Sequence, residues 1–129
     1  MILGGASRLV QAHPDLQRVI QVVAETWDLV VLETARTPER QAEMVRTGKS
    51  KTLQSQHLVQ ADGFAHAVDL APMPIDWNDT RRWYYFGGVC LATAKHLRVP
   101  LIWGGDWNNN TQVGDQTFLD LDHIELQEA

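Results

Sequence analysis

The sequence has one cysteine, no long apolar run and no excess of basic residues, and each shortage excludes a class of protein. Cys90 has no partner for an internal disulfide, and its apolar neighbours predict a space-filling core residue rather than a catalytic thiol. No segment approaches the roughly 18 apolar residues of a membrane-spanning helix, so no stable membrane insertion is expected. The formal charge of −5 argues against a nucleic-acid partner, because phosphates demand a basic face.

The length and composition are typical of one ordinary globular domain. We expect a single domain over residues 1–129, acting as a monomer, with 44% hydrophobic and 21% charged residues. The first ten residues, MILGGASRLV, lack the basic start and the sustained apolar stretch of a secretory signal. If the protein acts outside the cytoplasm, something else must then release it.

Hydrophobic periodicity predicts helices and strands that do not alternate strictly. A helix is expected to begin at Pro14, where apolar residues follow a helical stripe, and others to span residues 38–48 and 80–97. Strands are expected at residues 29–32, 66–70, 101–103 and 118–126. Residues 49–65 are polar and without period, which predicts a long loop of the kind that is often functional. This mixture favours an α+β fold, with helices layered on a small, mostly antiparallel sheet.

Two histidines and one aspartate form the strongest candidate for chemistry. His57 lies in the long loop, and Asp69 interrupts the apolar strand Ala-Val-Asp-Leu-Ala. A buried carboxylate needs a metal ion, a cation or several backbone donors, although Asp69 could instead cap a turn or pair with Arg36. With His123, these residues would make a three-ligand zinc set whose fourth position is open for water. Their spacing matches no short general motif.

Strand alternation separates the last histidine from a nearby acid. In the segment from Asp120 to Leu126, His123 and Glu125 share one strand face while Asp120 belongs to the other. A bend or bulge just before His123 would be required for Asp120 to reach the same site.

Six ordered motifs, spread over residues 28–126, resemble the VanY-like zinc peptidases. Within that family the chain is most similar to the L-alanyl-D-glutamate endopeptidases found as phage endolysins, which implies a fold of the hedgehog/DD-peptidase type. The motifs are Arg36-Thr37-x-x-x-Gln41, Gly48-x-Ser50-x-Thr52, Ser55-x-His57, Gly63-x-x-His66-Ala67-Val68-Asp69-Leu70, Trp103-Gly104-Gly105-Asp106-Trp107 and Asp120-x-x-His123-Ile124-Glu125-Leu126.

The resemblance assigns metal and catalytic roles by position. It implies that His57, Asp69 and His123 bind zinc, and that Asp120 accepts the proton of the attacking water and passes it to the leaving amine. Many family members space the first two ligands more tightly, which leaves His66 as an alternative ligand. His66 is less favoured, because it and Asp69 are an odd number of residues apart and should point to opposite strand faces.

The resemblance also suggests residues that contact the substrate. Arg36, assigned as a catalytic residue, would hold a substrate carboxylate or stabilise the oxyanion, or else form a salt bridge that orders the loop. Ser55, Gln41 and Trp103 are expected to bind substrate. Trp103 and Trp107 flank a Gly-Gly turn, however, where they are at least as compatible with core packing.

The resemblance implies a hydrolase, a zinc metallopeptidase that cuts the L-alanyl-D-glutamate bond of peptidoglycan stem peptides. Two alternatives remain open: a D-Ala-D-Ala carboxypeptidase or dipeptidase, and a non-catalytic zinc-containing module that binds the wall, for which Asp120 would be dispensable. The expected location is the host bacterial cytoplasm, followed by action on the cell wall after release. The same sequence features would fit a phage enzyme and a bacterial one.

Overall fold

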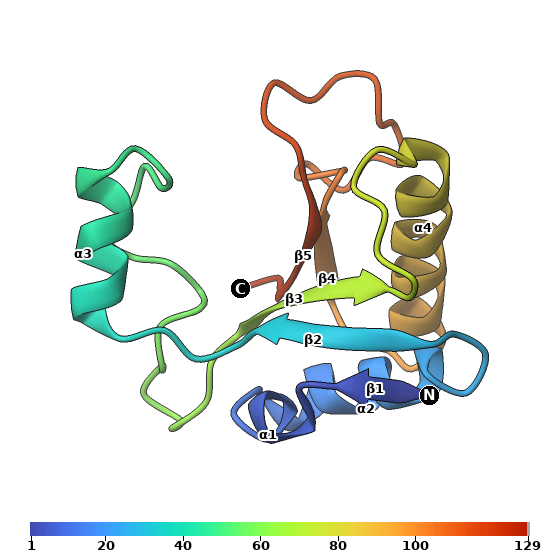
Figure 1. The fold of residues 1–129 in the computed structure, drawn as a ribbon, viewed down its shortest axis with the longest axis horizontal. Helices are drawn as coiled ribbons and strands as arrows, with labels where there is room; N and C mark the ends of the chain where they lie inside the picture. The colour runs from blue at the N-terminus through green and yellow to red at the C-terminus, as the bar shows by residue number, and fades with distance from the viewer. Residues whose placement is uncertain (129) are drawn as a thin grey trace.

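Five strands form one sheet in the part of the chain that the computed structural model describes, residues 1–128. The sheet order is β1-β2-β3-β5-β4, so the last strand is inserted between β3 and β4 (Figure 1). The elements in chain order are β1 (Ile2–Gly4), α1 (Ala6–Leu9), α2 (Pro14–Val23), β2 (Leu29–Glu33), α3 (Pro38–Arg46), β3 (Ala67–Pro72), α4 (Thr80–His96), β4 (Leu101–Gly104) and β5 (Asp120–Leu126).

The predicted α+β class is confirmed. The pairs β2–β3, β3–β5 and β4–β5 are antiparallel, and only the short edge strand β1 runs parallel to its neighbour β2. The sequence did not predict β1 or α1. A three-residue strand carries too little alternation to detect, and its hydrogen bonds depend on the edge of β2, which is far away in the sequence.

The three longer helices begin at the residues that the sequence indicated. His13 precedes α2, and its ring Nδ1 accepts a hydrogen bond from the backbone N–H of Asp15. Thr37 caps α3 in the same manner by accepting from the N–H of Arg40. Both helices have proline at the first position, where the missing N–H costs no hydrogen bond.

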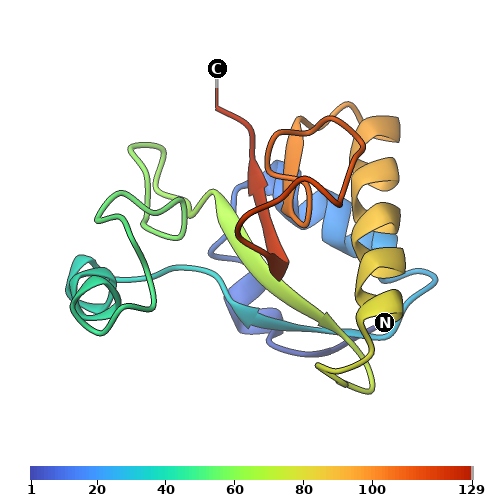
Figure 2. The same cartoon turned by 90° about the horizontal axis from the view of Figure 1, so that it is seen from above.

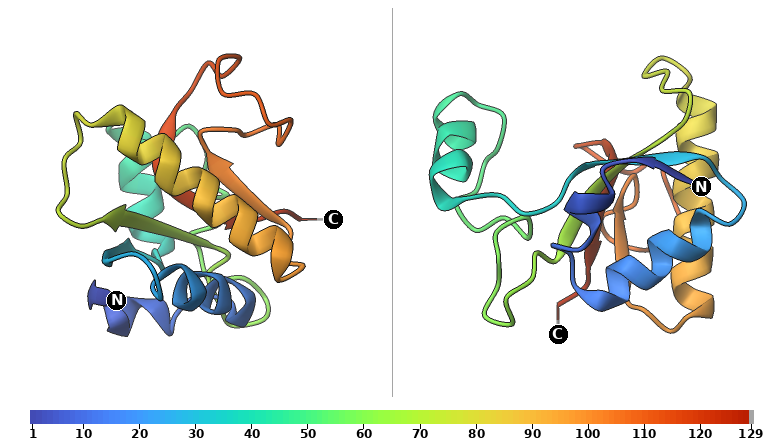
Figure 3. Two further views of the ribbon diagram at one scale, coloured as in Figure 1. Left: turned by 90° about the vertical axis from the view of Figure 1, so that its right-hand side faces the viewer. Right: turned by 60° about the horizontal axis from the view of Figure 1, so that its bottom comes forward.

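The hydrophobic core lies between the sheet and the helices α2 and α4, which cover one sheet face (Figure 3). Val68 and Leu70 of β3 and Ile124 of β5 point into this core. Because strand neighbours point to opposite faces, Asp69 and His123 must lie on the other face. Cys90 of α4 is buried in the core as predicted, and burial raises the pKa of its thiol to about 12.

Close packing explains a glycine inside α4. A Cβ on Gly87 would overlap the indole ring of Trp103, so α4 can lie against β4 only because this side chain is missing.

The segment from α3 to the start of β3 extends away from the two core helices. Figures 1 and 2 show α3 at the opposite end of the molecule from α4, connected to the sheet by extended chain. The loop that follows α3 carries His57 back toward the exposed sheet face. Within residues 1–128, no helix has the combination of length and apolar character needed to cross a membrane.

Candidate metal centre

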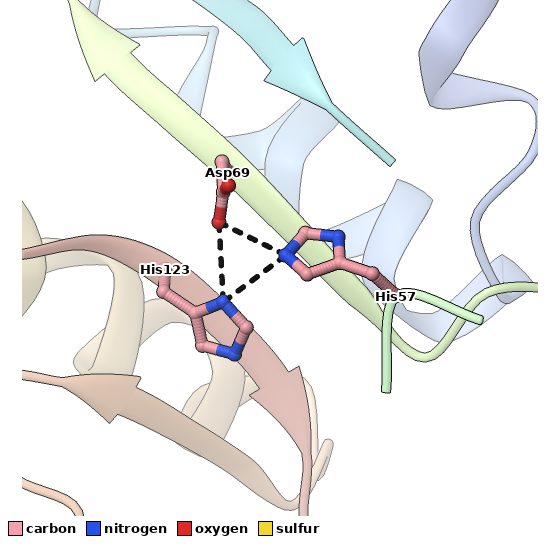
Figure 4. A group of neighbouring side chains, drawn as sticks. All are labelled: His57, Asp69 and His123. Carbon is pink, nitrogen blue, oxygen red and sulfur yellow. Dashed lines mark hydrogen bonds and ion pairs between the residues drawn. The ribbon is translucent and has the colours of Figure 1, made fainter. Parts of the chain in front are cut away.

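Three side chains converge on the sheet face that the helices leave open. Nε2 of His57 lies 3.2 Å from Oδ1 of Asp69 and 3.2 Å from Nδ1 of His123, and the last two atoms are 3.1 Å apart (Figure 4). Both histidines are buried, and Asp69 is partly buried. The three residues that the sequence singled out as ligands therefore present one atom each to a common point.

The sheet register brings two of these residues together. Asp69 of β3 and His123 of β5 are direct partners in an antiparallel pair, so their side chains stand side by side on the same face. His57 arrives from the loop, which is attached to the segment after β2: the N–H of Arg36 donates to the carbonyl of His57 over 2.8 Å. The site therefore depends on contacts between segments that are far apart in the sequence.

Each histidine is oriented by a hydrogen bond from its other ring nitrogen. Nδ1 of His57 lies 2.9 Å from the carbonyl oxygen of Thr34, and Nε2 of His123 lies 2.9 Å from Oε1 of Glu125. Both partners are acceptors, so these two nitrogens carry the protons. In the neutral rings, the nitrogens that face Asp69 are left with free lone pairs, as metal coordination requires.

The arrangement fits a small divalent cation. Zinc–ligand bonds of about 2.0–2.1 Å in a tetrahedral site place the ligand atoms about 3.3 Å apart. The separations of 3.1 and 3.2 Å observed here are close to this value. Two imidazole lone pairs and a carboxylate oxygen at these distances repel one another unless a positive charge lies between them. Two histidines and one carboxylate also leave coordination positions for solvent or substrate.

The surroundings favour positive charge at this point. Burial opposes ionisation of Asp69, but when the ring nitrogens that face it carry protons instead of a metal, their hydrogen bonds to Asp69 outweigh the effect of burial and hold the pKa of its carboxyl far below its usual range. Burial likewise opposes the charged form of His123, yet Asp69 and Glu125 raise the pKa of its ring to about 10. The same negative groups would stabilise a bound cation.

Asp120 reaches the site through an irregularity in β5. On β4, Trp103 and Gly104 are adjacent, but their partners on β5 are Ile124 and Asp120. The extra residues bulge and bring Oδ2 of Asp120 to 3.9 Å from Nδ1 of His123, which confirms the expected bend before His123. A Cβ on Gly104 would overlap the carbonyl of Asp120, so glycine is needed for this close approach.

A second acid, Asp122, lies beside Asp120 and Asp69. One carboxylate oxygen from each of these three aspartates falls within 4.8 Å of the others. Burial is the main reason that the pKa of Asp122 rises to about 8, and its hydrogen bond with Asp120 and the charge of Asp69 add to the effect. Asp122 therefore favours its protonated form at neutral pH.

Arg36, Gln41 and Ser55 support the loop that carries His57. Arg36 is 8% exposed and donates to Glu33 and to the amide oxygen of Gln41. Gln41 is fully buried, and its NH₂ group donates to Ser50 and to the carbonyl of Thr52. The hydroxyl of Ser55 accepts from the N–H of His57. The loop-ordering salt bridge considered for Arg36 is thus present, while direct substrate contacts of these three residues stay predictions.

The two tryptophans beside the Gly-Gly turn have different environments. Trp103 is 3% exposed, packs against α4 and donates its indole N–H to the carbonyl of Leu121, which are the contacts of a core residue. Trp107 is partly exposed, and its ring centroid lies 5.3 Å from that of His123. An open hollow of about 490 Å³ adjoins Trp107 and is also lined by Gln116 and Phe118. Of the two, Trp107 is the tryptophan next to the candidate site.

His66 does not take part in the convergence. Its Nε2 lies 2.7 Å from a carboxylate oxygen of Asp62, and its Nδ1 lies 2.7 Å from one of Glu128. Both ring nitrogens face acceptors, so both carry protons and neither offers a lone pair to a metal. Burial opposes the charge on this ring, but the hydrogen bonds to Glu128 and Asp62 raise the pKa of His66 above its usual value.

A raised pKa at His66 predicts a pH-dependent contribution to stability. The stabilisation is complete below the unfolded-state pKa of about 6.5 and is lost as pH rises through the higher folded-state pKa. We expect the difference in free energy of unfolding between wild type and His66→Gln, measured by urea titration, to be larger at mildly acidic pH than at alkaline pH. The effect should be small, because the partner carboxylates are exposed. His96→Gln, at the exposed end of α4, is the control, and an equal pH dependence in both variants would contradict the prediction.

Comparison with known proteins identifies close relatives in sequence and in structure. The family described as phage L-alanyl-D-glutamate peptidase matches residues 4–127. The chain is 27% identical over 130 residues to the L-alanyl-D-glutamate peptidase of Escherichia phage T5, covering 92% of this chain and 91% of that protein. It is 35% identical over 100 residues to the corresponding peptidase of Listeria phage A118, covering 77% of this chain but 30% of that protein. The crystal structure of Serratia marcescens L-Ala D-Glu endopeptidase ChiX superposes with a TM-score of 0.77 at 30% identity, covering 97% of this chain and 90% of that one.

Proposed function

Since this chain belongs to the phage L-alanyl-D-glutamate peptidase family, we propose that it hydrolyses the L-alanyl-D-glutamate bond of peptidoglycan stem peptides with a zinc ion held by His57, Asp69 and His123. The observation that carries the proposal is the meeting of these three ligand atoms within 3.2 Å of one another, with the carboxylate of Asp120 beside them. A peptidase of this kind needs both a Lewis acid and a proton acceptor, and this sheet face offers the residues for both.

The protein side chains divide the chemistry between them. When bound, zinc would polarise the scissile carbonyl and lower the pKa of water, so that the water loses its proton more readily near neutral pH. Asp120 accepts the proton that the water loses as its oxygen bonds to the carbonyl carbon. The same carboxyl returns that proton to the amine as the C–N bond breaks, so the products are a carboxylate and a free amino group. Asp120 is 39% exposed and can therefore reach a substrate bound over the site.

Zinc is favoured over other metals by the reaction rather than by the ligands alone. Two histidines and one carboxylate also hold iron(II) in oxygenases. A hydrolytic family membership favours zinc, which has no redox chemistry of its own. Elemental analysis of the purified protein by mass spectrometry would distinguish the two metals.

The remaining predicted residues act around this centre. Arg36 and Gln41 hold the start of the His57 loop, and Arg36 has a second terminal nitrogen with which to bind a substrate carboxylate. Ser55 fixes the turn that presents His57. Trp103 is buried and packs against α4. Trp107, which lies beside His123, is therefore the better candidate for contact with the substrate. The ligand set comes from one chain, which supports action as a monomer, and a wall substrate requires release from the host cytoplasm.

Digestion of purified peptidoglycan tests the bond that is cut. We expect mass spectrometry to find new amino termini at D-glutamate after treatment with the wild-type protein, and none after treatment with chelated protein. Released terminal D-alanine would instead indicate a carboxypeptidase. Unchanged peptidoglycan, together with retention of the protein on the wall, would indicate a binding module and overturn the proposed activity.

A further inference from the structure

Glu125 occupies a position where an acidic side chain needs an explanation. It lies on β5, an inner strand of the sheet, between Ala67 of β3 and Ile102 of β4. Its side chain is 20% exposed. Inner strand positions favour apolar or β-branched residues, and a largely buried carboxylate is costly unless it is paired.

The partner of Glu125 is a ring nitrogen of the candidate metal centre. Oε1 of Glu125 accepts a hydrogen bond from Nε2 of His123 over 2.9 Å, and strand alternation places both residues on the same sheet face. Glu125 does not belong to the group of atoms that converge with Asp69. Glu125 therefore contacts His123 on the side of the ring that points away from the metal position.

We infer that Glu125 is a positioning residue of the metal centre, which fixes the tautomer and the orientation of His123 so that Nδ1 presents its lone pair to the cation. The inference rests on the metal site of the proposed function. A carboxylate behind a ligating histidine also makes the ring a stronger donor. His57 has a neutral carbonyl, that of Thr34, in the equivalent place, so the two histidines are not equivalent ligands.

The chain contains a matched control for this contact. Glu128 also bonds a histidine, His66, over 2.7 Å, but that ring does not reach the metal position. Removing either carboxylate breaks one Glu–His hydrogen bond near the same end of β5. Only the loss of Glu125 should alter zinc binding.

The test is zinc affinity, measured by competition with a chromophoric chelator in the absence of any substrate. We expect Glu125→Ala to weaken zinc binding by about 10–100-fold, as is usual for an outer partner of a ligating histidine. Glu125→Gln should lose less, because its amide oxygen still accepts the Nε2 proton. Glu128→Ala should bind zinc like the wild type.

Nitrogen-15 NMR of the histidine rings provides a second readout that does not depend on affinity. In the neutral form of the His123 ring, we expect the wild type to carry its proton on Nε2, and Glu125→Ala to show a mixture of tautomers. Circular dichroism confirms that each variant is folded, and Glu125→Gln keeps the test usable if the alanine variant is not. Wild-type affinity in both folded Glu125 variants, or an equal loss in Glu128→Ala, would overturn the inference. Because no wall substrate is used, an inactive protein that binds zinc would refute the proposed activity without affecting this result.

Discussion

Asp69→Asn is expected to lose zinc and peptidase activity together. The carboxylate of Asp69 is the only anionic member of the converging trio, and it lies 3.2 and 3.1 Å from the two histidine nitrogens. An amide of the same shape keeps the strand packing but offers a neutral oxygen, which is a much weaker ligand. Lewis-acid catalysis supplies several kcal/mol, so at about 1.4 kcal/mol per tenfold change the rate should fall by roughly 1,000-fold or more.

Two measurements check this expectation. Elemental mass spectrometry gives the zinc content, and release of amino groups from purified peptidoglycan gives the rate. Asp62→Asn is the matched control, because Asp62 also bonds a histidine but lies on the exposed side of the loop, outside the converging group. The control should keep both metal and activity. A variant of Asp69 that stays fully active after dialysis against a chelator would refute the metal centre.

The fold was largely readable from the sequence where local signals are strong. Pro14 and Pro38 mark helix starts because proline suits only the first helical turn, and the structure begins α2 and α3 at those residues. The alternation from Asp120 to Leu126 predicted that His123 and Glu125 share one strand face, and the structure brings these two side chains into hydrogen-bond contact. Each of these features depends on a few neighbouring residues, so no tertiary information was needed.

The site was harder to predict from the sequence than the fold, because its residues meet only in the folded chain. Periodicity cannot bring His57 from a loop to the face of β3. The three candidate ligands also match no short general motif, so the resemblance to known peptidases was needed to support their grouping. The acceptor for His57 is the backbone carbonyl of Thr34, which has no side-chain signature at all. Glu125 had a signal in principle, since it shares a strand face with His123, but alternation does not reveal a hydrogen bond.

The sequence placed Asp120 at the site only on the condition that the strand bends or bulges before His123. Alternation placed it on the wrong face, and a bulge before His123 had to be assumed to correct this. The structure contains that bulge, opposite Gly104. A glycine next to an irregular strand is the one local sign of it, because closely approaching backbones exclude a side chain.

Asp120→Asn is expected to separate catalysis from metal binding. Oδ2 of Asp120 lies 3.9 Å from Nδ1 of His123, beside the converging atoms rather than among them. The asparagine variant should therefore bind zinc like the wild type but lack the group that accepts and returns the proton. General acid–base catalysis contributes about 100- to 10,000-fold, and we expect a loss of this size in kcat on purified peptidoglycan, with zinc content unchanged.

The contrast with Asp69→Asn makes this result diagnostic. Loss of activity with zinc retained assigns proton transfer to Asp120, whereas loss of both would mean that Asp120 helps to hold the metal. Asp122 can replace it, because its carboxyl lies within 4.8 Å of Asp120 and the change to asparagine removes the charge of Asp120, one cause of the raised pKa of Asp122. If Asp120→Asn stays active and adding Asp122→Asn abolishes turnover with zinc still bound, the proton acceptor is Asp122. If the double variant also stays active, neither acid transfers the proton, and the mechanism proposed for this face of the sheet is wrong.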